Sequence, residues 1–246
     1  MEGPVFWAVA TLAAVLVGLG KGGLPVVAML SVPLLSLFIS PVAAAGLLLP
    51  IYVVTDMFGL WAYRRDFDRR VLWILVPGTT LGVGLGWATA SVVPEDLVTG
   101  IVGAIGAAFA ANLLLRSSAA PAPHPARLAP GLFWGTLTGF TSFVSHAGAP
   151  PFQVYVMPLR LGKAVFAGTS TILFAYVNAI KLVPYWALGQ FSPGNLKVAA
   201  LLMVPAALAV LVGVRMVRAL PEALFFKLVT WALLALSLRL MWQAFA

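Results

Sequence analysis

Long apolar stretches follow one another along the whole chain, separated by short segments of glycine, proline or charged residues. Several of them approach or exceed the roughly 20 residues with which a helix crosses a bilayer. None alternates between apolar and polar positions with a period of two, which excludes an outer-membrane β-barrel. The pattern predicts an all-α membrane protein with apolar helical segments at 5–20, 24–39, 41–63, 71–93, 97–115, 131–145, 150–161, 164–188, 196–214 and 223–245.

The first two segments are short, and Gly18-Leu19-Gly20-Lys21-Gly22-Gly23-Leu24-Pro25 separates them. Glycine and proline end one helix there and let another begin near Leu24. A break at membrane depth is tolerated only in protein or beside a watery cavity, and a charge there needs a partner. We therefore expect a small anion to bind at Lys21, Gly22, Gly23 and Pro25, aided by the start of the second helix. The alternative is a lysine that reaches a membrane face from a loose turn.

The second half of the chain repeats the first at a shift of 125 positions, which puts His146 on Lys21 and Gly148-Ala149-Pro150 on Gly23-Leu24-Pro25. At a shift of 127, Pro221-Glu222 answers Pro94-Glu95. Two similar halves, each with an interrupted segment, are typical of transporters built from inverted repeats. We expect a first transmembrane repeat at 1–116, a linker at 117–130 and a second repeat at 131–246, together forming one transport domain. Whether the broken pairs cross the membrane or re-enter is left open.

The break in the second half carries neutral polar side chains instead of a lysine. Hydroxyl, imidazole and amide groups can donate hydrogen bonds to the oxygens of an anion, and an imidazole can also take up a proton. The alternative is a polar cluster that holds helices together. We include in the substrate-binding prediction Ser142, Ser145, His146, Gly148 and Gln153.

Asp56 and Lys181 occupy equivalent positions under the same shift, and Asn178 lies one turn before Lys181. An intramembrane carboxylate and an intramembrane ammonium both call for partners. Asp56 is expected either to pair with Lys21 or Lys181 or to relay protons. In the alternative interpretation, the two charged side chains reach the lipid headgroups from helix ends.

The composition narrows the function further. The chain has no cysteine, two histidines and no paired carboxylates, so we expect no metal site and no cofactor. The formal net charge of +8 is better explained by positive cytoplasmic loops than by nucleic-acid binding. An intramembrane enzyme using His146, Ser145 and Asp56 is disfavoured, because no nucleophile-elbow, metal or paired-acid signature is present.

The basic residues also predict an orientation. If each broken pair returns to its starting side, ten of the fifteen Lys and Arg fall in cytoplasmic loops. Both termini then lie outside the cytoplasm, and the halves have inverted topology. The ten are Arg64, Arg65, Arg69, Arg70, Arg116, Arg127, Arg160, Lys163, Arg215 and Arg218.

Several motifs in this order resemble the TauE/SafE sulfite exporter family: Gly20-Lys21-Gly22-Gly23-Leu24-Pro25, Leu49-Pro50-Ile51 with Asp56, Tyr63-Arg64-Arg65, and Gly168-Thr169-Ser170. The resemblance covers nearly the whole chain. It implies a transporter of the bacterial inner membrane for a small sulfur-containing oxyanion such as sulfite, a sulfonate or sulfoacetate, with export as the expected direction. A passive anion channel is the alternative, and an intramembrane enzyme is a weaker one. The expected partners are the anion and the lipid bilayer, not nucleic acid, and the oligomeric state is left open.

Overall fold

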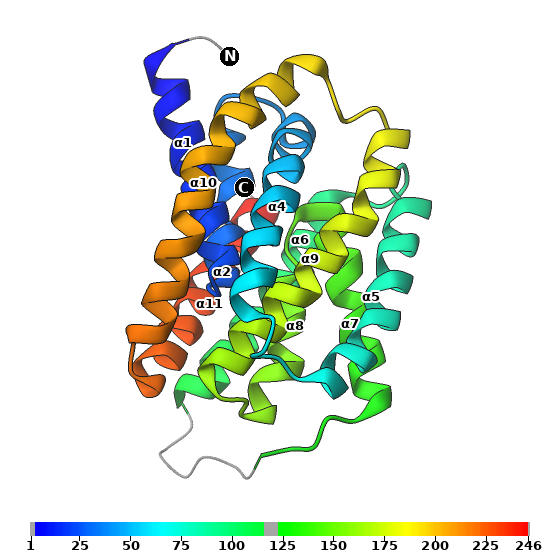
Figure 1. Cartoon of the computed structure of the whole chain (residues 1–246). Coiled ribbons are helices and arrows are strands. Elements are labelled where there is room, and N and C mark those ends of the chain that lie inside the picture. Colours follow the sequence, from blue (N-terminus) through cyan, green and yellow to red (C-terminus); the bar gives the residue numbers. More distant parts are fainter. Residues whose placement is uncertain (1–2, 116–122, 246) are drawn as a thin grey trace. The chain divides into compact units, whose positions relative to one another are not determined.

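The computed structural model describes residues 3–115 and 123–245, and this part of the chain is helical without β-strands (Figure 1). The elements occur in the same order twice. A long helix is followed by short helical pieces and then by three long helices. The first series is α1 (Pro4–Lys21), α2 (Pro25–Ala28), α3 (Ser31–Leu35), α4 (Pro41–Tyr63), α5 (Arg69–Ala88) and α6 (Glu95–Leu115). The second is α7 (Leu128–Ser145), α8 (Ala149–Val156) with the 3₁₀ turn η1 (Met157–Leu159), α9 (Lys163–Ala187), α10 (Pro193–Ala219) and α11 (Glu222–Phe245).

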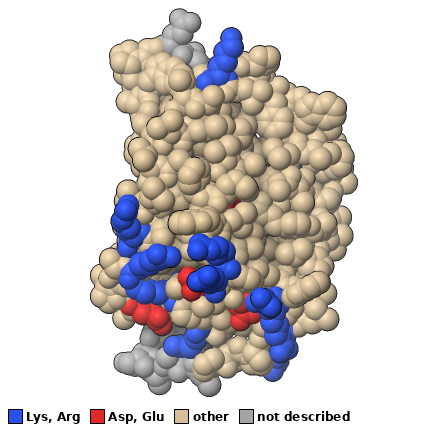
Figure 2. Space-filling view, viewed as in Figure 1, with Lys and Arg blue, Asp and Glu red and all other residues tan. Residues whose placement is uncertain are grey.

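Seven of the described helices, α1, α4, α5, α6, α9, α10 and α11, are long and apolar enough to cross a membrane. Uncharged atoms dominate the face drawn in Figure 2, where the Lys and Arg side chains stand in groups. With the mean hydropathy of +1.03, these helices confirm the prediction of an all-α, multi-pass membrane protein.

The predicted apolar segment 24–39 is helical over Pro25–Leu35, but a turn divides it into α2 and α3. Pro33 lies in the first turn of α3. Its ring would clash with the carbonyl of Met29, four residues earlier, if the helix ran on from α2. Met29 and Leu30 instead form a turn between the two pieces.

Other boundaries move by a few residues. Helix α10 begins earlier than predicted because Ser192 caps it, with the hydroxyl accepting from the Asn195 N–H at 3.1 Å. Helix α7 begins at Leu128, inside the predicted linker, with Pro130 in its first turn, where a proline is tolerated. The linker residues 117–122 and Arg116 lie outside the described residues. Helix α5 ends at Ala88, and turns carry the chain to Pro94.

The chain forms two compact units, each of which contains parts of both predicted repeats. The first comprises Met1–Phe67 and Ala167–Leu220. Here α1 packs against α10, and α4 packs against both. Their core is built from Phe6, Val17, Leu35, Leu47, Ile51 and Leu202, among others. Gly18 and Gly22 allow the close approach, since a Cβ on Gly22 would lie 2.6 Å from Gly213 Cα of α10.

The second unit comprises Asp68–Phe166 and Pro221–Ala246. Helix α5 packs against α7, and α6 packs against α11. Glycines again line the α5–α7 contact, because a Cβ on Gly78 would lie 2.7 Å from the Leu132 carbonyl oxygen. Phe166 stacks edge-on against Phe225 and Phe226, with ring centroids 6.0 and 5.5 Å away.

Candidate functional site

Lys21 is the last residue of α1 and is buried, with 6% of its side chain exposed. Its Nζ lies 2.7 Å from Oδ1 of Asp56, which projects from the middle of α4. The same ammonium stands 5.0 Å from the centroid of the Tyr52 ring, one turn earlier on α4. The sequence left several partners open for Asp56, and in the structure Asp56 forms an ion pair with Lys21. The Lys21 side chain is buried and paired, and it does not lie at the surface of the first unit.

Helix α9 supplies the other polar groups around Asp56. The Asn178 side-chain amide donates a hydrogen bond of 2.9 Å to Oδ2 of Asp56. Lys181, one turn later, is fully buried and interacts electrostatically with both Asp56 and Lys21. Its Nζ lies 5.5 Å from the centroid of the Tyr185 ring. The first unit thus gathers two ammonium groups around one carboxylate in its interior.

The glycines beside Lys21 shape the turn at the end of α1. Gly23 has φ of 111°, a conformation that L side chains rarely adopt. A Cβ there would also lie 2.6 Å from the Tyr63 hydroxyl oxygen. That hydroxyl donates a 2.6 Å hydrogen bond to the carbonyl oxygen of Gly22. Thr171 of α9 donates to the Lys21 carbonyl oxygen at 3.3 Å, so side chains satisfy carbonyls that the helix end leaves open.

The helix after the break contributes less than the sequence predicted. A helix does begin next to Leu24, at Pro25, but α2 is only four residues long. The N–H groups of Gly22, Gly23 and Leu24 donate back to carbonyls of Gly18 and Gly20. Because one turn has a small dipole and these donors are used, the positive charge here comes from lysine side chains.

In the second unit, the break between α7 and α8 lies at His146, which has φ of 53° in the left-handed region. Gly148 is the N-cap residue of α8. The Thr141 hydroxyl donates to the Ala147 carbonyl oxygen at 3.1 Å, and the Ser145 hydroxyl donates to the Thr141 carbonyl oxygen at 3.3 Å. These bonds tie the end of α7 to the turn. Ser142 is buried one turn before His146.

Gln153, on α8, is completely buried, and neither its side-chain nitrogen nor its oxygen has a hydrogen-bond partner in the structure. Burying an unpaired amide costs about 1–3 kcal/mol as measured by mutation. Such a group is commonly explained by a bound water, an ion or a functional role. Of the residues predicted from the second break, Gln153 is therefore the one whose side chain most needs a partner.

The predicted site residues are divided between the two units. Lys21, Asp56, Asn178 and Lys181 come together in the first. Ser142, Ser145, His146, Gly148 and Gln153 lie in the second. Sequence reasoning missed Tyr52, Tyr63 and Tyr185; a helical spacing of four residues places Tyr52 with Asp56 and Tyr185 with Lys181, and that signal could have revealed both. Across residues 3–115 and 123–245, no three His, Cys, Asp or Glu side chains form a group that could hold a metal ion.

The family described as sulfite exporter TauE/SafE matches residues 6–240. No curated protein and no solved structure matches the chain.

Proposed function

Because the chain belongs to the TauE/SafE family of membrane transporters, we propose that it exports a small sulfur-containing oxyanion across the bacterial inner membrane. Sulfite, a sulfonate or a sulfoacetate-like anion is the substrate class. The binding charge comes from Lys21 and Lys181, and Asn178 supplies a neutral donor. Gly22, Gly23 and Pro25 shape the turn that holds Lys21. In the second unit, Ser142, Ser145, His146, Gly148 and Gln153 are proposed as neutral binding groups.

One observation carries the proposal: a buried carboxylate, Asp56, pairs with one buried lysine, Lys21, and interacts electrostatically with a second, Lys181. Of the seven acidic residues in the sequence, only Asp56 lies well inside a predicted membrane segment. The formal charges of Lys21, Asp56 and Lys181 add up to +1. Buried charge is expensive unless it is compensated, so this cluster favours an additional anion. An oxyanion with several acceptor oxygens can satisfy ammonium and amide donors together.

Asp56 has a definite role in this proposal. When no substrate is bound, its carboxylate keeps Lys21 paired, and the unit does not bury two bare cations. A substrate anion competes with Asp56 for the same ammonium groups. Binding is therefore weaker than two lysines alone would give, which suits a carrier that must release what it binds. Proton relay through Asp56 is not needed for this function.

The orientation is proposed from two further observations. In the first unit the chain returns to its starting end, because the Phe38 ring lies 6.1 Å from that of Phe6 near the start of α1. In the second unit the Tyr155 hydroxyl donates to the Arg127 carbonyl oxygen, next to the start of α7, at 3.0 Å. If both broken pairs return in this way and three helices cross in each half, the halves are inverted and both termini lie outside the cytoplasm.

The test uses purified protein in liposomes with labelled sulfite and labelled sulfoacetate. Saturable counterflow is expected of a carrier. Unsaturable current would instead indicate a channel, and chemical turnover without transport would indicate an enzyme.

The same assay tests whether the charges of the cluster bind the anion. Lys21→Met should abolish flux, and Asp56→Asn should tighten anion binding. Lys21→Met/Asp56→Asn restores the net charge and should recover binding in part. Lys197→Met, on the exposed part of α10, is the control.

If Lys21→Met transports as well as Lys197→Met does, the proposed site is wrong. The protein would remain a member of its family, but the charge of this cluster would have no part in binding. Melting temperatures of the same samples separate this outcome from unfolding, because the double variant removes both members of the ion pair and leaves neither Lys21 nor Asp56 without the other.

A further inference from the structure

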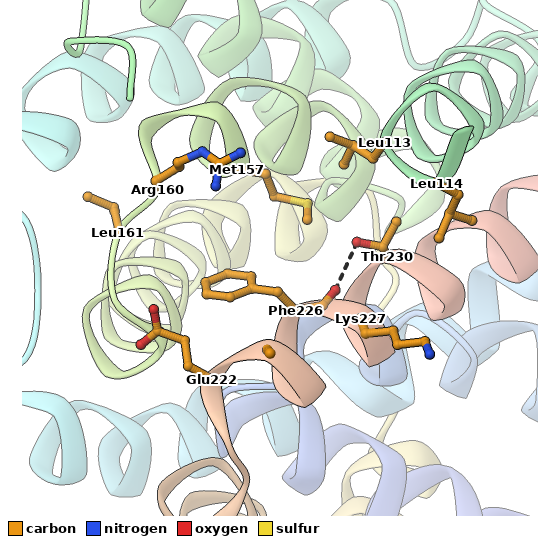
Figure 3. Close-up of a pocket in the computed structure, with 10 residues that line it drawn as sticks. Leu113, Leu114, Met157, Arg160, Leu161, Glu222, Phe226, Lys227 and Thr230 are labelled. Atoms are coloured by element: carbon orange, nitrogen blue, oxygen red, sulfur yellow. Dashed lines mark hydrogen bonds between the residues drawn. The ribbon is translucent and has the colours of Figure 1, made fainter. Parts of the chain in front are cut away.

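A partly open cavity of about 520 Å³ lies in the second unit, and none of the residues proposed above for anion binding lines it (Figure 3). It is bounded by the end of α6, the turn after α8 and the start of α11. Its apolar wall consists of Leu113, Leu114, Met157, Leu161 and Phe226. The volume is within the range of small-molecule sites, about 300–1,000 Å³.

Three charged residues also line the cavity: Arg160, Lys227 and Glu222. Figure 3 shows Arg160 and Lys227 on different sides of the Phe226 ring. The Glu222 carboxylate accepts from the Lys163 N–H at 3.4 Å, at the beginning of α9. Two cations against one carboxylate leave the cavity with a positive balance. It therefore favours a ligand that is anionic at one end and apolar at the other.

Arg160 has φ of 52°, in the left-handed region, directly after the 3₁₀ turn. A glycine at this position would avoid the strain that a Cβ brings there. The chain instead carries a guanidinium at a position that lines the cavity. Strain of this kind is a recognised pointer to function, and here it coincides with a group that can bind a phosphate in bidentate fashion.

We propose that this cavity binds the headgroup of an anionic membrane phospholipid. The phosphate pairs with Arg160, and Lys227 adds the second positive charge from within the second turn of α11. The upper part of an acyl chain covers Leu113, Leu114 and Met157. A soluble phosphate would leave these apolar side chains uncovered, whereas lipid is present around every membrane helix. Basic pockets among helix ends are known to select anionic headgroups. This site is independent of the proposed anion transport.

The experiment compares lipid retention by the full-length protein in mild detergent, measured by native mass spectrometry. The probes are phosphatidylglycerol and phosphatidylcholine with identical acyl chains, so that only the headgroup differs. The wild-type protein is expected to retain phosphatidylglycerol about tenfold better, as one or two charge-assisted contacts would give. Arg160→Gln and Lys227→Gln should each remove most of that preference. Arg160→Gly should remove it while relieving the backbone strain.

Two further variants sharpen the result. Arg239→Gln, an equal change of charge at an exposed position on the same helix α11, should leave the preference unchanged. Glu222→Gln keeps the hydrogen-bond acceptor but removes a negative charge, so it should strengthen phosphatidylglycerol retention. The proposal is overturned if Arg160→Gln and Lys227→Gln behave like Arg239→Gln. It is also overturned if glycerol phosphate displaces the lipid at equal concentration, because the ligand would then be a soluble phosphate.

Discussion

The buried ion pair between Lys21 and Asp56 contributes less to folding than its short distance suggests. Desolvation offsets much of the attraction, and apolar residues of similar size are often as stable or more stable in such places. A second buried lysine near the pair adds a further desolvation cost, which a purely structural role would not explain. For these residues we therefore propose a role in anion binding, which substitutions can separate from a role in stability.

The first prediction concerns Lys181→Met, which keeps the length of the side chain and removes its charge. The Lys21–Asp56 pair then stands alone with no net charge. We expect binding of labelled sulfite to weaken at least tenfold, because a charge-assisted hydrogen bond contributes about 1.5–3 kcal/mol. The melting temperature should not fall. Binding is measured by scintillation proximity on purified protein, and affinity equal to that of Lys197→Met would contradict the role of Lys181.

The second prediction concerns Gly23→Ala. The positive φ and the Tyr63 hydroxyl, 2.6 Å from the added Cβ, both oppose the methyl group. We expect a loss of about 1–3 kcal/mol in the free energy of unfolding, seen as a lower melting temperature in detergent. Gly84→Ala is the matched control, because no atom lies within 4 Å of a Cβ there and α5 is helical around it. That control should be neutral or stabilising. Equal melting temperatures for the two variants would show that the turn tolerates a side chain.

Much of the charged cluster could be predicted from single residues. Lys21 stands out because glycines surround it in an apolar sequence, and Asp56 and Lys181 stand out as intramembrane charges at equivalent positions. Which of them pair could not be predicted, because pairing depends on how α1, α4 and α9 meet. Tyr63 is a clear example: nothing in its sequence surroundings indicates that its hydroxyl binds the Gly22 carbonyl, 41 residues away.

For the two broken helix pairs, the sequence predicted where each helix is interrupted but not the path of the chain after the interruption. Stretches of 12 to 16 apolar residues suit a tilted crossing and a re-entrant segment equally well. The contacts between Phe6 and Phe38 and between Arg127 and Tyr155 bring the chain back to its starting end within each unit, as either a re-entrant pair or two crossings would. Such contacts depend on the angle of the turn, which glycine and proline permit but do not specify.

The third prediction concerns α8 and uses Gln153→Met. The side chains are similar in size, and methionine has no amide to leave unpaired. We expect the melting temperature to rise, because removal of a buried unsatisfied amide gains about 1–3 kcal/mol. We expect transport to fall if Gln153 binds the anion. Thermal unfolding and liposome flux are measured on the same preparation. A less stable protein with unchanged flux would indicate that Gln153 is a packing residue with a partner such as buried water.

In the chain as a whole, helices of one sequence half pack against helices of the other half within each compact unit. Helix α1 of the first half packs against α10 of the second, and α7 of the second half packs against α5 of the first. The two pairs occupy equivalent places in the order of elements. The repeat in the sequence shows which segments are alike, but it does not show that each compact unit takes segments from both halves. This exchange is a property of tertiary packing, and helix hydrophobicity alone does not encode it.

The last prediction concerns the energy source. A negative cell interior drives an anion outward by about 2.3 kcal/mol per charge for every 100 mV. At that potential a monoanion can be concentrated nearly fifty-fold outside, by the tenfold per 1.4 kcal/mol relation. Export therefore needs no sodium or proton partner. If a proton were carried, Asp56 would be the carboxylate to test, and in the structure it forms an ion pair with Lys21.

We therefore expect electrogenic export that does not depend on another ion. In liposomes with a potassium–valinomycin potential and no pH gradient, flux of labelled anion should follow the imposed voltage and reverse with it. Asp56→Asn should keep this response, because the voltage acts on the charge of the substrate and not on a proton at residue 56. His146→Ala serves as a second test of proton coupling, since an imidazole titrates between about pH 5 and 8. A flux that ignores voltage and collapses with the proton gradient would contradict this mechanism, and it would make Asp56 a proton carrier whose release of Lys21 admits the anion.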